Sequence, residues 1–359
     1  MGSANSQMIG LARESRLLTQ GELAKKAGVA QGTISKTENG QVPATRDLVE
    51  RIAPVLDYPV SLFYYDPPRV KNLPMPFYRK RIRVPRKIER SVRASMNLRR
   101  FELEKLLRSV EIPELRVPLL RSAEYHGDME RVAREVRTRW HIRPGPIENL
   151  TTLMESVGVL ILPFDFGTNQ IVGMSVCEPD DDLPPVILMN PTIPGDRWRH
   201  TVAHELAHVM LHHHLELPGE SIEDEANRFA GAFLMPASDI KGHLNRVSIE
   251  RLADLKPYWK TSIRSMVIRA YQLDRISEWQ YARFFRQLNA RYGATNEPVQ
   301  IPREEPTLIA EIIKTHTVDL GYTEDQMRGL LCLNPNEYRG FYASRQAPPA
   351  QGLTLRAVK

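Results

Sequence analysis

The sequence predicts a mostly helical α+β protein built from several domains. Its 359 residues are more than one hydrophobic core usually supports, so about two to three domains are expected. Apolar residues recur at helical spacings along most of the chain, while three short β-branched runs near the middle predict strands. We therefore expect an all-α N-terminal domain, a domain with a small sheet of three or more strands, and further helices toward the C-terminus.

Changes in composition along the chain predict the domain boundaries. The turn-forming and proline-rich stretches separate segments that have regular apolar patterns. The expected segments are a compact helical unit over 1–66, a basic linker and helix over 67–118, a central domain over 119–290, a helical region over 291–345, and a disordered tail over 346–359.

The central domain is expected to combine a small, largely antiparallel sheet with helices. The predicted strands are Gly158–Leu162, Gln170–Val176 and Pro185–Asn190, which are separated by Asp, Gly and Pro turns. Asp196 is expected to act as the N-cap of a helix of about 16 residues. A further helix is predicted over residues 221–235.

The composition is that of a globular protein without a membrane span or a disulfide framework. Hydrophobic residues make up 42% of the chain and charged residues 26%. No run approaches the roughly 20 consecutive apolar residues that cross a bilayer, and the N-terminus lacks the apolar core of a signal peptide. The two cysteines, Cys177 and Cys332, lie far apart in the sequence. We therefore expect no membrane partner and a cytoplasmic location.

Positive charge is concentrated in one segment that follows the first helical unit. Residues 69–108 contain 14 Lys or Arg against three Glu, a local charge of +11, whereas the formal net charge of the whole chain is only +6. The rest of the chain is therefore acidic. Such a concentration favours contact with a polyanion. A solvated linker face is the alternative interpretation.

The segment His204-Glu205-Leu206-Ala207-His208 has the pattern of a zinc-binding helix. Residues four apart on a helix lie about 40° from each other, so both imidazoles can be directed at one ion. Glu205 lies to the side, where it can take a proton from a metal-activated water. We predict one Zn²⁺ per chain, with His204 and His208 as metal ligands and Glu205 as the catalytic base.

A catalytic zinc site also needs a third protein ligand and an open position. His214 lies six residues after His208, but Leu211 occupies the position where a glycine would be needed to turn the chain back. On a continuing helix, His214 would point away from the ion. We therefore prefer Glu223 as the third ligand, with Glu225 as the alternative.

The helix that carries Glu223 has small residues on the same face. Ala226 and Ala230 would let it pack closely against the histidine helix. Asn227 lies on this face too and is expected to orient a metal ligand. His212, one turn after the zinc motif, could form a hydrogen bond or line the rim of the site.

Three segments together resemble the ImmA/IrrE family of zinc metallopeptidases: GVLILPF with PPVILMN, TVAHELAHVMLHH, and EDEANRFAGAFLMP. The resemblance covers about residues 120–290. It implies a gluzincin-like domain in which His204, His208 and Glu223 bind zinc and Glu205 activates water. Known members cleave DNA-bound repressor proteins and so switch on stress-response or mobile-element genes. The implied partner is therefore a regulatory protein substrate.

Metallopeptidases of this kind often bind their substrate as an additional strand on a free sheet edge. Residues Val172–Cys177 or Val186–Asn190 could provide such an edge. A sheet that only supports the zinc helix is the alternative.

The N-terminal unit contains a second recognisable pattern, over residues 19–40. Thr19 and Glu22 have the spacing of a capping box at the start of a helix, and Gly28 provides a turn before the next helix. The pattern resembles the XRE family of phage-repressor-like helix-turn-helix domains across residues 7–65. The resemblance implies a recognition helix over about residues 31–38.

Double-stranded DNA is the partner that this resemblance implies. Polar side chains on the outward face of the expected recognition helix and around it can reach base edges and phosphates. The candidate contacts are Gln20, Gln31, Thr33 and Lys36, with Asn39 and Arg46 expected on the DNA backbone. A homodimer is the usual form of such DNA-binding proteins. A protein-interaction module is the alternative for this domain.

The sequence therefore predicts a DNA-binding transcriptional regulator that carries a zinc-dependent metallopeptidase. The peptidase would hydrolyse a peptide bond in a regulatory protein. The alternative is a non-catalytic transcription factor, or an antitoxin-like protein, whose zinc domain senses a ligand, a metal or a partner.

Overall fold

The computed structural model describes residues 4–66, 84–177, 183–212, 220–293, 296–343 and 355–357. The chain forms two compact units. The first, here the terminal unit, contains residues 1–113, 166–170 and 307–359; the second, here the central unit, contains residues 114–165 and 171–306. The C-terminal helices thus belong to the same unit as the N-terminal helices, a grouping that the local sequence pattern did not predict.

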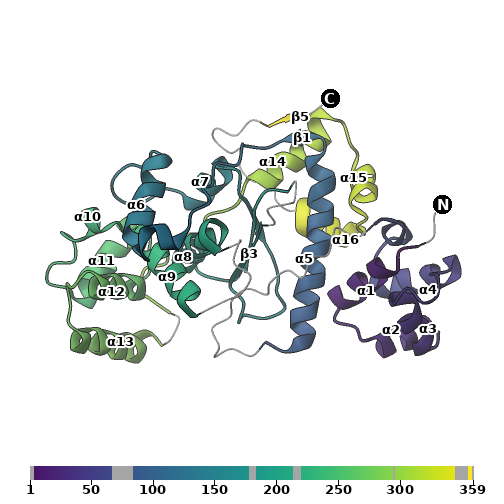
Figure 1. Cartoon of the computed structure of the whole chain (residues 1–359), viewed down its shortest axis with the longest axis horizontal. Coiled ribbons are helices and arrows are strands. Elements are labelled where there is room, and N and C mark those ends of the chain that lie inside the picture. Colours follow the sequence, from purple (N-terminus) through teal and green to yellow (C-terminus); the bar gives the residue numbers. More distant parts are fainter. Residues whose placement is uncertain are drawn as a thin grey trace. The chain divides into compact units, whose positions relative to one another are not determined.

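The N-terminal part of the terminal unit is all-helical (Figure 1). Its elements are α1 (Ser6–Ser15), α2 (Gln20–Ala27), α3 (Gln31–Glu38), α4 (Arg46–Leu56) and the 3₁₀ turn η1 (Val60–Tyr64). Thr19 and Glu22 form the expected capping box, and Gly28 ends α2 in the left-handed conformation with a φ of 67°. These local signals therefore set the boundaries of α2, as predicted.

Helix α5 (Arg86–Leu107) packs against α1 and contributes Leu98 and Phe101 to the core of the helix-turn-helix region. The C-terminal elements of this unit are α14 (Leu308–Lys314), the π-helical turn η4 (Thr315–Asp319), α15 (Glu324–Leu331), α16 (Pro335–Tyr338) and the π-helical turn η5 (Arg339–Ala343). Helices α14 and α15 pack onto α5.

Two strand residues come from the tail that we expected to be disordered. Arg356–Ala357 (β5) pairs antiparallel with Val110–Glu111 (β1). Residues 346–354 and 358–359 of the expected tail lie outside the described residues. A pairing of two residues depends on which backbone lies nearby in the fold, so local composition does not predict it.

A buried polar network joins α5 to the C-terminal helices. The Glu102 carboxylate accepts hydrogen bonds of 2.5 Å from both the Arg99 guanidinium and the Tyr342 hydroxyl. Burial raises the pKa of Glu102 to about 7, in spite of the charge of Arg99. Lys105 donates to the carbonyl of Leu330. Arg99 and Lys105, in the C-terminal half of α5, therefore direct their positive charges at partners within the terminal unit.

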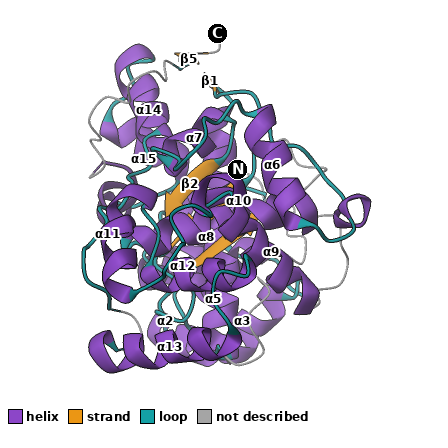
Figure 2. Cartoon of the chain, turned by 90° about the vertical axis from the view of Figure 1, so that its left-hand side faces the viewer, coloured by secondary structure: helices purple, strands orange, loops and turns teal. Residues whose placement is uncertain are grey.

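The central unit contains a small sheet within a larger set of helices, as the colours of Figure 2 show. Its elements are η2 (Ser122–Tyr125), α6 (Met129–Arg139), α7 (Leu150–Ser156), β2 (Leu160–Pro163), β3 (Gly173–Val176), β4 (Val186–Met189), α8 (Gly195–Ala207), the π-helical turn η3 (His208–His212), α9 (Glu220–Leu234), α10 (Ala237–Ile240), α11 (Ile249–Trp259), α12 (Ile263–Gln272) and α13 (Glu278–Tyr292).

The three strands of the central unit lie where the sequence predicted them, but the sheet is mixed rather than largely antiparallel. The strand order is β2-β4-β3, in which β2 runs parallel to β4 and β3 runs antiparallel to it. Strand β4 is paired on both sides, so the prediction that Val186–Asn190 could offer a free edge is wrong. Among the described strands, β3 has a partner on one side only.

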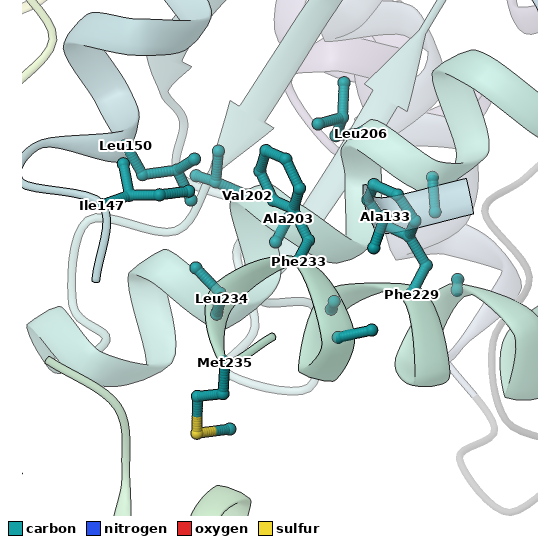
Figure 3. Packing of buried hydrophobic residues seen from close by; sticks show 14 of the residues in the cluster. Ala133, Ile147, Leu150, Val202, Ala203, Leu206, Phe229, Phe233, Leu234 and Met235 are labelled. Carbon is teal, nitrogen blue, oxygen red and sulfur yellow. The ribbon is translucent and has the colours of Figure 1, made fainter. Parts of the chain in front are cut away.

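Helices α8 and α9 pack together at the centre of this unit, with α6 beside α9. Figure 3 shows Val202, Ala203 and Leu206 of α8 near Phe229 and Phe233 of α9. All five side chains are buried. The small Ala226 and Ala230 are buried too, in agreement with the predicted close approach of the two helices.

The start of α8 differs from the prediction. Pro194 is the N-cap, while Asp196 lies inside the first turn and forms a 2.7 Å ion pair with the buried Lys256. Glu297 binds the same ammonium group at 3.0 Å. A tertiary charge partner thus replaces the expected capping role, because an ammonium buried in the core needs carboxylates close to it.

No described helix is both long enough and apolar enough to span a membrane.

Candidate metal centre and DNA-binding helices

The predicted metal ligands come together at the junction of α8, η3 and α9. The Nε2 atoms of His204 and His208 lie 3.1 Å apart. The Glu223 carboxylate approaches them from α9, with one oxygen 3.5 Å from Nε2 of His204 and the other 3.4 Å from Nε2 of His208. In the described part of the chain, the ligand atoms of these three side chains lie close enough together to bind one metal ion.

The spacing of these donor atoms fits a tetrahedral ion. Bonds of about 2.0–2.1 Å at tetrahedral angles would place ligand atoms about 3.3–3.4 Å apart. The observed separations of 3.1, 3.5 and 3.4 Å lie close to this value. Two imidazoles and one carboxylate also form a donor set that zinc uses in hydrolytic enzymes. The residues present therefore suit the metal.

The electrostatics of this cluster favour an ionised Glu223. Burial alone would raise its pKa, but hydrogen bonding and charge interactions with His204 and His208 outweigh this effect and lower the pKa to about 2. Burial also opposes the charged form of His204, yet the nearby Glu223 and Glu205 carboxylates raise the pKa of that imidazole. A carboxylate that is ionised at neutral pH is ready to bind a cation.

Glu205 lies beside the cluster without joining it. The residue is only 6% exposed. In the described part of the chain its carboxylate forms no hydrogen bond or ion pair, and it acts on His204 through its charge alone. Its oxygens are therefore available to accept a proton from water.

Glu225 has a different set of partners from Glu223. One carboxylate oxygen accepts a 2.9 Å hydrogen bond from the Ser122 hydroxyl, and the other lies 3.2 Å from Nε2 of His212. Nδ1 of His212 lies 2.9 Å from Nδ1 of His208. A hydrogen-bonded chain of side chains thus runs from Glu225 through His212 to His208. It ends at Nδ1 of His208, the ring nitrogen that does not face Glu223.

This hydrogen-bonded chain can hold the His208 ring in one orientation. Burial and the neighbouring His208 lower the pKa of His212 to about 4, so His212 is neutral at neutral pH and can donate through one nitrogen and accept through the other. Partners of this kind fix the ring position and tautomer of metal-binding histidines.

A hydrogen-bonding role was expected for His212. Its link to Glu225 was not predicted, because that link depends on the packing of α9 against η3. Helix α8 continues into π-helical turn η3 at His208, a local form that is often found at functional sites. His214 lies outside the described residues.

Asn227 contacts the cluster from α9. Its amide nitrogen donates a 2.7 Å hydrogen bond to the backbone carbonyl of Glu223. Its side chain also contributes to the raised pKa of His204.

The candidate DNA-contacting residues lie on or beside α2 and α3. Gln31, Thr33, Lys36 and Asn39 are exposed. Ile34 of the same helix is fully buried. Helix α3 therefore presents polar residues outward and packs through its apolar face.

The two remaining candidates are held by acidic neighbours. Gln20, at the start of α2, donates a 2.8 Å hydrogen bond to Glu38, which also pairs with Arg13 at 2.6 Å. The exposed Arg46 pairs with Glu50 within α4 at 2.7 Å. Both side chains lie near the helix-turn-helix elements, but each is bound to a carboxylate of the same domain.

Two family models match the chain. Residues 9–63 match a helix-turn-helix family, and residues 154–271 match the IrrE N-terminal-like domain. A search of curated proteins gives no match. Both resemblances predicted from the sequence are thereby confirmed, in the predicted order. The chain carries a helix-turn-helix domain of the DNA-binding type, followed by a metallopeptidase-like domain whose family is generally zinc-dependent.

Proposed function

We propose that this protein is a DNA-binding transcriptional regulator whose central unit is a zinc-dependent peptidase acting on a regulatory protein. The observation that carries the proposal is the convergence of His204, His208 and Glu223 beside Glu205, whose carboxylate has no partner among the described residues. The same chain also has a helix-turn-helix domain. In this proposal the three converging residues bind one zinc ion, and Glu205 is the catalytic base.

Bound zinc would polarise the scissile carbonyl and lower the pKa of a water molecule to about 7. Glu205 accepts the proton of the attacking water and later returns it to the leaving amine. The charge of Glu223 and the hydrogen-bonded chain behind His208 keep the metal-binding side chains in place. The buried setting of α8 excludes bulk water and strengthens each of these electrostatic effects.

We propose that the peptide substrate binds along strand β3. This strand is unpaired on one side among the described strands, and it lies beside α8 and η3. Gly173 of β3 supports this close approach, because an added Cβ would lie 2.4 Å from the Thr201 methyl group of α8. Backbone pairing with β3 would place an extended segment next to the cluster.

The order of the units along the chain suggests how cleavage and DNA binding are combined. The central unit is inserted between two parts of the terminal unit, which carries the helix-turn-helix domain. Binding to an operator, as a homodimer, would hold the peptidase near other proteins that occupy the same DNA. Cleavage of such a regulator would change expression of stress-response genes.

The choice between Glu223 and Glu225 tests the proposed site. Glu225→Gln changes only the hydrogen-bonded partner of His212, which in turn orients His208. Loss of such an indirect partner lowers metal affinity by about 10–100-fold. Glu223→Gln removes the charge of a direct ligand, so its zinc affinity should fall further than that of Glu225→Gln. Competition with a zinc chelator measures both affinities against the wild-type chain. A larger loss in Glu225→Gln would assign the third ligand to Glu225 instead.

A further inference from the structure

The helix-turn-helix region has little free positive charge of its own. Residues 1–66 contain seven Lys or Arg and seven acidic residues. Four of these cations form ion pairs with carboxylates: Arg13 with Glu38, Arg16 with Glu337, Arg46 with Glu50, and Arg51 with Asp47. Attraction to phosphates supplies much of the affinity of proteins for DNA, so further cations are expected nearby.

The first two turns of α5 carry three such cations. Arg86, Lys87 and Arg90 are all exposed. Arg86 and Arg90 form no ion pair with any described residue, and Lys87 has only a 3.6 Å contact with the exposed Glu22. The dipole of α5 does not favour cations at this end of a helix. These three positive charges therefore do not stabilise α5 itself.

This basic surface continues the surface of the helix-turn-helix region. Lys87 contacts Glu22 in the first turn of α2, and the Ser91 hydroxyl donates a 3.1 Å hydrogen bond to the carbonyl of Ser15 at the end of α1. Figure 1 shows this end of α5 with α1 and α2. In helix-turn-helix domains, the helix before the recognition helix crosses the DNA backbone. A cation beside the start of α2 therefore lies next to the path of that backbone.

We infer that Arg86, Lys87 and Arg90 form a second DNA contact, which binds the phosphate backbone beside the site occupied by the helix-turn-helix. The contact adds affinity for any duplex sequence and no preference among sequences, because phosphates carry no base information. This inference rests on the proposed DNA-binding role and extends it to a helix outside the matched residues 9–63.

The salt dependence of DNA binding tests the inference. The full-length triple variant Arg86→Gln, Lys87→Gln, Arg90→Gln is compared with wild type on a selected operator and on a random-sequence duplex. Loss of three phosphate contacts should reduce the slope of log K against log salt by about 2–3. Affinity for both duplexes should fall by the same factor, so that their ratio stays unchanged. An unchanged slope, or a loss confined to the operator, would overturn the inference.

Two single substitutions provide a matched control. Arg90→Gln and Arg108→Gln each remove one exposed arginine from opposite ends of α5. The 22 residues of this helix span about 33 Å, well beyond the screening length of about 10 Å in moderate salt. Only Arg90→Gln should weaken binding and lower the slope. An equal effect of both changes would indicate general charge attraction instead of a local contact.

A further variant separates this inference from the proposed function. Lys36→Ala, on the exposed face of α3, should reduce the preference for the operator over random DNA. If Lys36→Ala has this effect while the triple variant binds like wild type, only the second contact is disproved. If the wild-type chain binds neither duplex, the proposed DNA-binding role fails together with the inference.

Discussion

Glu205→Gln should stop peptide hydrolysis while the chain stays folded, binds zinc and binds DNA. A positioned general base contributes about 10²–10⁴-fold to the rate of such a reaction, so the variant should lose at least two orders of magnitude. The amide has almost the same shape as the carboxylate but cannot accept the proton from water. Because Glu205 makes no hydrogen bond in the described part of the chain, its replacement should leave the fold intact.

The same variant can be used to identify the substrate. An inactive peptidase should retain proteins that the active chain cleaves, so proteins that co-purify with Glu205→Gln are candidate substrates. Each is incubated with zinc-loaded wild-type chain and with the variant, and fragments are identified by mass spectrometry. Cleavage by both chains would rule out Glu205 as the base. Normal gene regulation in cells that carry Glu205→Gln would support a sensing role for the zinc domain in place of proteolysis.

Glu102→Ala should destabilise the terminal unit and leave the central unit folded. The change removes the shared partner of Arg99 and Tyr342, and it leaves a buried guanidinium without its carboxylate. Loss of one member of a buried ion pair costs about 3–5 kcal/mol. Tyr342 belongs to the C-terminal helices, so their attachment to α5 should weaken and DNA binding should fall. Zinc binding by the central unit should not change.

Thermal unfolding of the full chain, measured above the pKa of Glu102, tests this expectation. Glu104→Ala is the matched control, because Glu104 lies on the same helix but pairs with the exposed Arg108. A surface pair of this kind contributes about 0–1 kcal/mol. Equal destabilisation by the two substitutions would mean that the buried network does not hold the C-terminal helices in the terminal unit.

Features that depend on neighbouring residues in the sequence could be predicted well. The capping box at Thr19 and Glu22 is present in α2. The two histidines of the zinc motif lie one helical turn apart, and their positions relative to each other follow from helix geometry. Glu223 lies beside both histidines, as the pattern of its helix predicted, and Ala226 and Ala230 of the same helix are buried.

Features that depend on distant residues could not be predicted in this way. Asp196 looked like a helix cap, but Lys256 from α11 determines its role. The parallel pairing of β2 with β4 depends on how the chain crosses between them. The contact between His212 and Glu225 depends on the packing of α9 against η3. In each case a tertiary contact outweighs the local preference.

Zinc content of the purified full-length protein tests the proposed metal centre directly. After loading with zinc and removal of free metal, the wild-type chain should contain one ion, and His208→Ala should contain almost none. Glu225→Gln should also contain one ion, because Glu225 contacts His212 and is not one of the proposed metal ligands. A wild-type chain that retains no zinc, or a His208→Ala variant that retains a full equivalent, would contradict the proposed metal centre.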